Sequence, residues 1–166
     1  ARIPTLEDVI DSLPEGKKFF IEIKCGTEIM KPLIKVIDLK VKERPILKTN
    51  ISFISFDKDV IKSCRTQWPD IEANYLESYK KIKGISKWAP NENEVFRLLK
   101  LSLASGIGTQ ANKEVLNPKF IKRLRLNQLS FHCWTINDVE TARHFRDLGV
   151  DSITTDFPKR IRDGLK

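Results

Sequence analysis

The chain has 166 residues, and its hydrophobic content of 40% is enough to bury one sizeable core, so we expect a single domain over residues 1–166. Lysine and arginine number 30 against 22 acidic residues. The net charge of +8 at pH 7 favours an anionic partner: a phosphate-bearing substrate, a membrane surface or nucleic acid. The sequence contains no run of eighteen apolar residues and no apolar leader region, which predicts neither a transmembrane segment nor a signal peptide within it.

The distribution of basic residues and cysteines narrows these classes. Lysines and arginines are scattered over the expected helices, without a basic tail or an Arg-rich arm, so we expect no nucleic-acid partner. The cysteines Cys25, Cys64 and Cys133 are odd in number and lack CxxC spacing, which argues against a disulfide framework and a structural zinc site. We expect reduced, mostly buried thiols, and a cytoplasmic location is favoured. The oligomeric state stays open.

Hydrophobic spacing and capping residues predict helices and strands in alternation along the chain. Thr5 precedes an acidic first turn, Pro32 falls in the first turn of its helix, and Asn137 opens a capping box with Glu140. Helices are expected to begin at Thr5, after Thr27, at Asp57, at Asn91 or Asn93, at Asn117, at Asn137 and after Asp156. Strands are expected over residues 18–24, 51–56, 71–76, 104–107, 129–136 and 150–155. Residues 79–90 and 108–114 are expected to be loops.

Six strands that alternate with helices are typical of a parallel α/β architecture. An open doubly wound sheet and a closed (β/α)8 TIM barrel both satisfy this pattern. No glycine-rich phosphate fingerprint follows any of the strands, which disfavours a dinucleotide-binding sheet. A barrel needs eight strands and typically about 250 residues, so the chain corresponds to the C-terminal three quarters of a barrel, with about six of its eight strands.

The first expected strand ends in two side chains with complementary chemistry. Glu22 and Lys24 are two positions apart, so they lie on the same side of the strand, about 6 to 7 Å apart along it. The Glu22 carboxylate suits a hard cation such as Ca²⁺ or Mg²⁺, and the Lys24 ammonium suits a phosphoryl oxygen. The alternative is a charged edge strand on which the two side chains form an ion pair with each other.

Further candidates lie where the other expected strands end. Trp134 either lines a pocket or packs in the core. His132 faces the same way as Trp134 and is either a base or, as we favour, a histidine whose hydrogen bonds are satisfied in the core. We expect His144 at the surface, and Asp156 as the cap of the last helix in preference to a hydrogen bond in the site. The remaining candidates are Ser55, Phe56, Glu77, residues 109–112, Asn137 and Thr155.

Several short segments, taken in order, resemble the glycerophosphodiester phosphodiesterase family over essentially the whole chain. These segments are Ile3-Pro4-Thr5-Leu6-Glu7, Phe20-Ile21-Glu22-Ile23-Lys24, Ile54-Ser55-Phe56, Trp134-Thr135-Ile136-Asn137 and residues 149–158. The resemblance implies a (β/α)8 barrel that uses a divalent cation to hydrolyse glycerophosphodiesters to glycerol 3-phosphate and an alcohol. It also implies that Glu22 is a metal ligand, that Lys24 contacts the phosphate and that Trp134 borders the substrate pocket.

The chain also departs from the pattern of that family. A His-Arg-Gly strand, a Glu-x-Asp pair and a second His-Asp segment precede the Pro-Thr-Leu-Glu helix in the family, and none of them occurs in these 166 residues. The catalytic residues are therefore unknown here, because the expected histidines belong to that N-terminal segment. Since a general acid or base typically contributes a factor of about 10² to 10⁴, we expect this segment alone to be inactive and the intact protein to be an enzyme. The alternative is a non-catalytic barrel fragment or phosphate-binding module.

Overall fold

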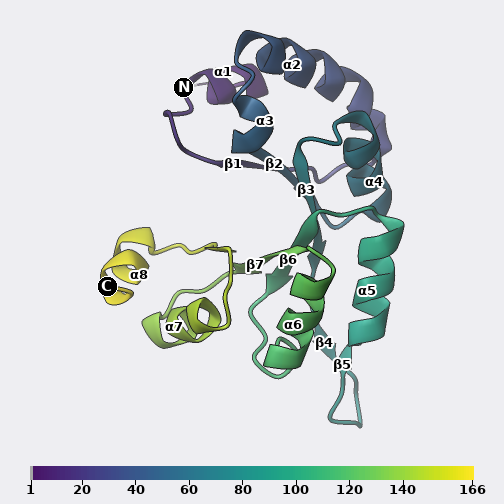
Figure 1. The fold of residues 1–166 in the computed structure, drawn as a ribbon, viewed down its shortest axis with the longest axis vertical. Helices are drawn as coiled ribbons and strands as arrows, with labels where there is room; N and C mark the ends of the chain where they lie inside the picture. Colours follow the sequence, from purple (N-terminus) through teal and green to yellow (C-terminus); the bar gives the residue numbers. More distant parts are fainter. Residues whose placement is uncertain (1) are drawn as a thin grey trace.

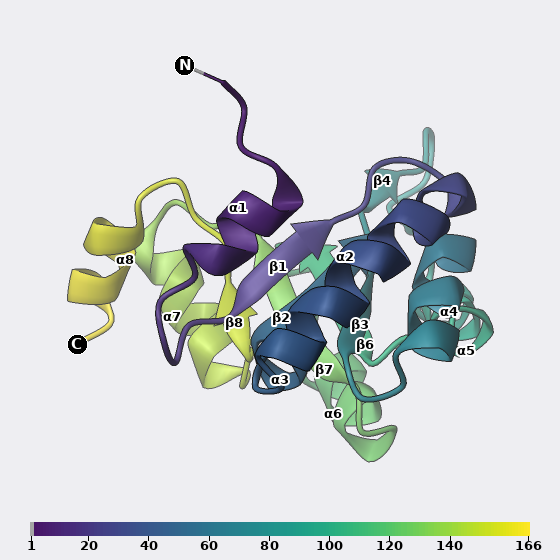
Figure 2. The same ribbon diagram turned by 90° about the horizontal axis from the view of Figure 1, so that it is seen from above.

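The computed structural model describes residues 2–166. Six parallel strands form one curled sheet, and helices cover its outer face (Figures 1 and 2). The strands are β1 (Phe19–Glu22), β2 (Ile51–Ser55), β3 (Glu72–Glu77), β6 (Gly106–Gln110), β7 (Ser130–Trp134) and β8 (Ser152–Ile153). The helices are α1 (Leu6–Asp11), α2 (Met30–Glu43), α3 (Leu47–Asn50), α4 (Lys58–Gln67), α5 (Glu92–Leu101), α6 (Pro118–Leu126), α7 (Val139–Asp147) and α8 (Pro158–Gly164), with a 3₁₀ turn η1 (Thr27–Ile29) before α2.

The strand order decides between the two predicted topologies. The sheet runs β1-β2-β3-β6-β7-β8, so each strand lies beside the previous one and the direction never reverses. A doubly wound sheet reverses direction at a switch point, whereas a (β/α)8 barrel advances in one sense. The predicted barrel class with six strands is confirmed. In Figure 1 the helices form an arc around the strands that stays open between α1 and α8.

Most helices begin at the predicted capping residue. The Thr5 side chain accepts a hydrogen bond from the Asp8 amide at 3.2 Å, and the Asp8 carboxylate accepts one from the Thr5 amide at 2.9 Å. Asn91 makes the same reciprocal pair with Glu94, which settles the choice between Asn91 and Asn93. These bonds satisfy amides that the first turn of a helix leaves without partners, so the start of each helix is set locally.

Two capping predictions are wrong. The N-cap of α7 is Asp138, whose carboxylate accepts a hydrogen bond from the Thr141 amide at 2.8 Å, and not Asn137. The N-cap of α8 is Phe157, without a side-chain capping bond, and not Asp156. Asn137 and Asp156 are instead hydrogen-bonded to each other, because the ends of β7 and β8 lie side by side.

The strands expected over residues 18–24 and 150–155 are shorter in the structure, at Phe19–Glu22 and Ser152–Ile153, and two further segments differ more strongly from the predicted strands and loops. Strand β6 begins at Gly106 and continues to Gln110, so the strand expected over residues 104–107 and the loop expected from residue 108 are displaced. Within the expected loop 79–90, β4 (Lys80–Lys81) and β5 (Trp88–Ala89) form an antiparallel hairpin. Glycines in β6 and lysines in β4 hide the hydrophobic alternation that signals a strand.

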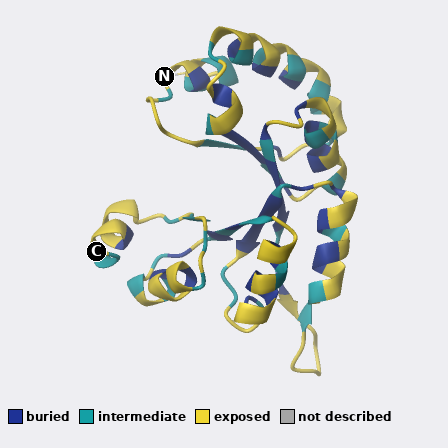
Figure 3. Ribbon diagram, viewed as in Figure 1, coloured by how far each residue is buried: buried dark blue, intermediate teal, exposed yellow. Residues whose placement is uncertain are grey.

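The hydrophobic core lies between the sheet and the helices. In Figure 3 the buried residues follow the strands and the sheet-facing side of each helix. Phe53 of β2 stacks on Trp68 with ring centroids 5.1 Å apart, and Phe131 of β7 meets Phe145 of α7 edge to face at 6.3 Å. These aromatic pairs fix helices to outward-facing strand residues, so the inward-facing residues are free for other roles.

The inner face carries a polar network near the amino ends of the strands. His132 is 12% exposed, and its Nδ1 lies 2.8 Å from the Ser152 hydroxyl. Its Nε2 lies 3.1 Å from the Ser130 hydroxyl and 3.4 Å from a Glu72 carboxylate oxygen. The prediction that His132 is a satisfied core histidine is confirmed. Hydrogen bonds from His132 and Ser130 lower the pKa of Glu72 to about 2, against its ordinary value of 4.5.

This depressed pKa predicts how the stability of the fold depends on pH. The network favours ionised Glu72, so its stabilising contribution is complete above pH 4.5 and is lost as the pH falls toward 2. The carboxylate is 23% exposed, and the loss amounts to about 3 kcal/mol at most. Glu72→Gln should flatten the decline in the free energy of urea unfolding between about pH 5 and about pH 3. Glu140→Gln, at a carboxylate that is 94% exposed, is the matched control. An unchanged slope in Glu72→Gln would contradict this assignment.

Candidate functional site

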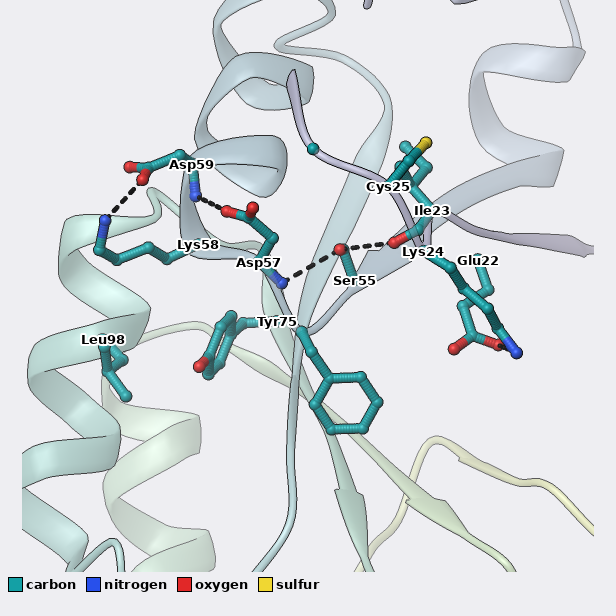
Figure 4. A pocket seen from close by; sticks show the side chains of 12 residues that line it. Glu22, Ile23, Lys24, Cys25, Ser55, Asp57, Lys58, Asp59, Tyr75 and Leu98 are labelled. Atoms are coloured by element: carbon teal, nitrogen blue, oxygen red, sulfur yellow. Dashed lines mark hydrogen bonds and ion pairs between the residues drawn. The ribbon is translucent and has the colours of Figure 1, made fainter. Parts of the chain in front are cut away.

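A pocket of about 820 Å³ opens where β1 and β2 end (Figure 4). It lies between the loop that follows β1 and the start of α4, and its lining includes Glu22, Lys24, Cys25, Ser55, Asp57 and Tyr75. This is the carboxyl edge of the parallel sheet, the end at which (β/α)8 barrels place their active sites. The position of the pocket therefore agrees with the strand-end candidates expected from the sequence.

Ser55 holds the loops on either side of this pocket together. Its buried hydroxyl donates a hydrogen bond to the Ile23 carbonyl at 2.7 Å and accepts one from the Asp57 amide at 3.1 Å. Asp57 in turn caps α4 by accepting a hydrogen bond from the Asp59 amide at 2.7 Å. Both bonds of the Ser55 hydroxyl go to the backbone, so this side chain positions the end of β1 against the start of α4.

Glu22 and Lys24 project together from the end of β1, as Figure 4 shows. The Lys24 ammonium lies 3.5 Å from a Glu22 carboxylate oxygen, with the two side chains 78% and 37% exposed. An ion pair as exposed as this contributes little to stability, so it does not prevent either group from binding a ligand. The ion pair that the sequence left open as an alternative is thus present.

A second pocket, of about 250 Å³, connects Glu22 with Trp134 on the inner face of the sheet. Its lining also includes Ile54, Phe56 and Leu76. Ile54 and Leu76 are not among the site candidates expected from the sequence, although strand alternation indicates this inner surface, because Glu22 pairs with Ile54 in the β1–β2 register. The structure brings Glu22, Lys24 and Trp134 to the same rim, and their roles stay predictions.

The indole of Trp134 has an unused hydrogen-bond donor. Its ring meets Phe56 edge to face at 5.8 Å, which fixes its orientation in the rim. The Nε1 atom is buried, and no acceptor within residues 2–166 lies in hydrogen-bond reach. Since a buried N–H without a partner is costly, an oxygen atom of a ligand in this pocket is a natural acceptor for it.

The ends of β7 and β8 are joined by a polar cluster. The Asn137 side-chain amide donates to the Asp156 carboxylate at 2.8 Å, and its carbonyl oxygen accepts from the Thr155 hydroxyl at 3.1 Å and from the Asp156 amide at 3.0 Å. The three candidates are therefore brought together, in contact with one another. They fix the loop after β7, on which the rim pocket depends.

The other candidates lie apart from this rim or have internal partners. Glu77 accepts a hydrogen bond from the Ser78 amide at 2.9 Å, and burial raises its pKa above the ordinary value. His144 is exposed on α7, as predicted.

Cys64 and Cys133 are buried free thiols and Cys25 is an exposed one, so the expectation of mostly buried thiols is confirmed. Burial raises the pKa of Cys64 to about 12, so this thiol stays protonated and unreactive.

The residues present offer an incomplete set of ligands for a divalent cation. Ca²⁺ and Mg²⁺ are bound by several oxygen atoms, and the Glu22 carboxylate is a suitable donor. No group of three or more His, Cys, Asp or Glu side chains that could hold a metal ion occurs in the described part of the chain. Residues 2–166 therefore do not form a complete metal site, and Glu22 is the carboxylate that the sequence predicts as a ligand.

Residues 1–160 match the model of the glycerophosphoryl diester phosphodiesterase family. The chain belongs to this family. It is 21% identical over 161 residues to a glycerophosphodiester phosphodiesterase of Bacillus subtilis, covering 95% of the chain and 52% of that relative. It is 27% identical to a human glycerophosphocholine phosphodiesterase, covering 98% of the chain and 26% of that relative. The chain thus spans about half or less of the length of these two curated relatives.

Solved structures support the same fold. A phosphodiesterase of Oleispira antarctica in complex with the product sn-glycerol-3-phosphate superimposes with a TM-score of 0.70 at 18% identity, covering 98% of this chain and 61% of the other. A protein of Silicibacter pomeroyi described as a glycerophosphoryl diester phosphodiesterase superimposes with a TM-score of 0.73 at 19% identity, covering 98% of this chain and 56% of the other. At this level of identity the similarity establishes the shared barrel architecture of the family.

None of the helices within residues 2–166 is both long and apolar enough to cross a bilayer.

Proposed function

We propose that this protein, at its full length, hydrolyses glycerophosphodiesters to glycerol 3-phosphate and an alcohol. The observation that carries the proposal is that Glu22, Lys24 and Trp134 meet at the carboxyl rim of a barrel sheet whose chain belongs to the phosphodiesterase family. The phosphodiesterases of Bacillus subtilis and human to which the chain is similar, and the complex of the Oleispira antarctica protein with sn-glycerol-3-phosphate, support this proposal.

We assign a separate role to each of the three side chains. The exposed Lys24 ammonium binds the phosphoryl oxygens and stabilises the negative charge that develops there, exchanging Glu22 for the phosphate as its partner. The Trp134 indole borders the glycerol or alcohol moiety and donates its Nε1 hydrogen to an oxygen of the substrate. Glu22 would supply one oxygen ligand to a divalent cation, Ca²⁺ or Mg²⁺, for which the described residues alone do not complete the ligand set.

A non-catalytic phosphate-binding module is the second candidate. The sequence has two histidines, and the structure places neither at the rim: His132 is hydrogen-bonded in the inner polar network and His144 is exposed on α7. The described rim residues therefore include no histidine that could act as a general acid or base. A module that binds glycerol 3-phosphate without turnover would need only Lys24 and Trp134.

One assay separates the two candidates. The full-length protein is incubated with glycerophosphocholine and a divalent cation, and glycerol 3-phosphate and choline are followed by NMR. Release of both products supports the hydrolase. Binding of glycerol 3-phosphate in calorimetry, with no release of choline, supports the phosphate-binding module and overturns the hydrolase.

The role of Lys24 predicts a large effect on the reaction. Lys24→Gln should lower kcat/KM for glycerophosphocholine by about 10²-fold, because a fixed positive charge beside the phosphoryl group is lost. The exposure of Lys24 means that the thermal unfolding temperature should not change. Lys48→Gln is the matched control, since Lys48 is exposed on α3, which precedes β2, and is paired with Asp70. An unchanged kcat/KM in Lys24→Gln would remove this residue from the site.

A further inference from the structure

The connection between β3 and α5 carries a hairpin that projects from the body of the protein (Figure 1). Its strands β4 and β5 pair antiparallel, with Lys81 opposite Trp88, and the Ile82 amide donates to the Lys87 carbonyl at 2.9 Å. Residues 80–87 are all exposed, and two isoleucines lie at the tip. Ile82 is 41% exposed and Ile85 is 52% exposed. Burial of each isoleucine would be favourable, so two isoleucines exposed at the tip of a hairpin indicate a surface that binds a partner.

The base of the hairpin is anchored while its tip is free. Tyr79 is 4% exposed, and the Trp88 indole donates a hydrogen bond to the Glu114 carboxylate at 2.9 Å. Lys81 lies over the Trp88 ring, with its ammonium 5.7 Å from the ring centroid. The aromatic residues of the hairpin are thus engaged with the body of the protein, and the tip is held at a fixed position in front of it.

All charged side chains of the hairpin are positive. Residues 79–90 contain four lysines and no acidic residue. The lysines are Lys80, Lys81, Lys83 and Lys87. None of the four is in an ion pair within the part of the chain that the structure describes. The tip therefore combines uncompensated positive charge with exposed aliphatic side chains.

We propose that this hairpin docks on the surface of a bilayer that contains anionic phospholipid. Lysines near such a surface are attracted by its negative potential, and aliphatic side chains gain by entering the boundary between headgroups and acyl chains. Long lysine side chains reach the headgroup phosphates while their stems stay beside the apolar tip. Ile82 and Ile85 insert, and the lysines around them bind the headgroups.

The chemistry of the tip favours a bilayer over a nucleic acid. Single-stranded nucleic acid is bound by aromatic side chains on which bases stack, and the hairpin offers no exposed aromatic ring. Trp88 is half-buried and bonded to Glu114, and Tyr79 is buried. Two exposed isoleucines have no role on a phosphate backbone but match an acyl boundary.

Docking in this way has a consequence for orientation. The hairpin leaves the carboxyl end of β3, and Glu22 lies at the carboxyl end of β1 in the same parallel sheet. In Figure 2 the β1 arrow points toward the end of the molecule at which the hairpin lies. The rim with the candidate site and the docking tip therefore belong to one end of the sheet, and docking brings that rim close to the bilayer. The proposal does not depend on hydrolysis.

Vesicle sedimentation tests the proposal on the full-length protein. Partitioning is measured with vesicles of phosphatidylcholine alone and of phosphatidylcholine mixed with phosphatidylserine. The triple variant Lys80→Gln, Lys83→Gln, Lys87→Gln should partition about 100-fold less into the anionic vesicles, and Ile82→Ser with Ile85→Ser about tenfold less. Circular dichroism checks that each variant is folded.

Matched variants elsewhere on the surface control for net charge and for exposed apolar area. Lys159→Gln, Arg160→Gln, Arg162→Gln removes three exposed charges from α8, and Leu101→Ser with Leu126→Ser removes two exposed leucines. Both should partition like the unaltered protein. Equal losses in control and hairpin variants, or no preference for anionic vesicles, would overturn the proposal. Retention of polyuridylate through the hairpin lysines, without vesicle binding, would overturn it in favour of RNA.

Discussion

Replacement of Glu22 by glutamine in the full-length protein is expected to lower kcat/KM for glycerophosphocholine by about 10²- to 10³-fold. The Glu22 carboxylate lies beside the Lys24 ammonium, and we propose that it binds a divalent cation. Glutamine keeps the shape of the side chain but removes its charge. A loss of this size is typical when one preorganised electrostatic group is removed from an active site. The rate of choline release at several concentrations of Ca²⁺ or Mg²⁺ measures the effect.

The structure predicts that this loss occurs without unfolding. The Glu22 side chain is 37% exposed, and its one ion pair is with an even more exposed lysine. The thermal unfolding temperature of Glu22→Gln should therefore match that of the unaltered protein. Glu15→Gln, at an exposed carboxylate in the loop before β1, is the control and should keep full activity. Full activity in Glu22→Gln would show that another group performs the role assigned to Glu22.

Replacement of Gly106 by alanine is expected to destabilise the fold by about 3 kcal/mol or more. A Cβ atom at this position in β6 would overlap the hydroxyl and the backbone carbonyl of Ser130, and would lie 2.8 Å from the Asn74 side-chain oxygen. The Ser130 backbone belongs to β7, so neither strand can give way without breaking the ladder between them. The Ser130 hydroxyl also binds Glu72 at 2.7 Å, so the polar network would be disturbed together with the sheet.

A second glycine in the same strand provides the control. A Cβ atom at Gly108 would approach the end of the flexible Leu76 side chain at 2.7 Å, and that side chain can move. Gly108→Ala should therefore cost about 1 kcal/mol. Urea unfolding at neutral pH measures both variants. Similar stabilities for the two would mean that the space around Gly106 is larger than the structure indicates.

These two glycines also explain why part of the fold could not be predicted from the sequence. The strands around Phe53 and Phe131 can be recognised by apolar alternation, because one of their faces packs against helices, and the strand around Phe20 can be recognised as a short apolar run. Strand β6 carries glycine at its inward positions, where neighbouring side chains fill the space, so hydrophobic alternation fails there. The β4–β5 hairpin is hidden in the sequence for a different reason: each of its strands has only two residues, and β4 consists of two lysines.

At the candidate site, too, some features can be predicted from the sequence and others cannot. The position of Glu22 and Lys24 on one side of the chain at the end of β1 follows from strand alternation, and the approach of Glu22 to Trp134 follows from parallel strands ending at one edge. The choice of Asp138 over Asn137 as a cap does not follow in this way. Asn137 is held by Thr155 and Asp156, which lie 18 and 19 residues further along the chain, and local sequence patterns carry no information about such a contact.

The sheet ends in two unprotected edges, and this affects how the chain behaves in isolation. Within residues 2–166, β1 pairs with β2 alone and β8 pairs with β7 alone. The outer amides and carbonyls of both strands are left for water or for another polypeptide to satisfy. A recombinant product restricted to these residues would therefore be expected to self-associate through these strand edges, and the associated fraction would rise with the protein concentration.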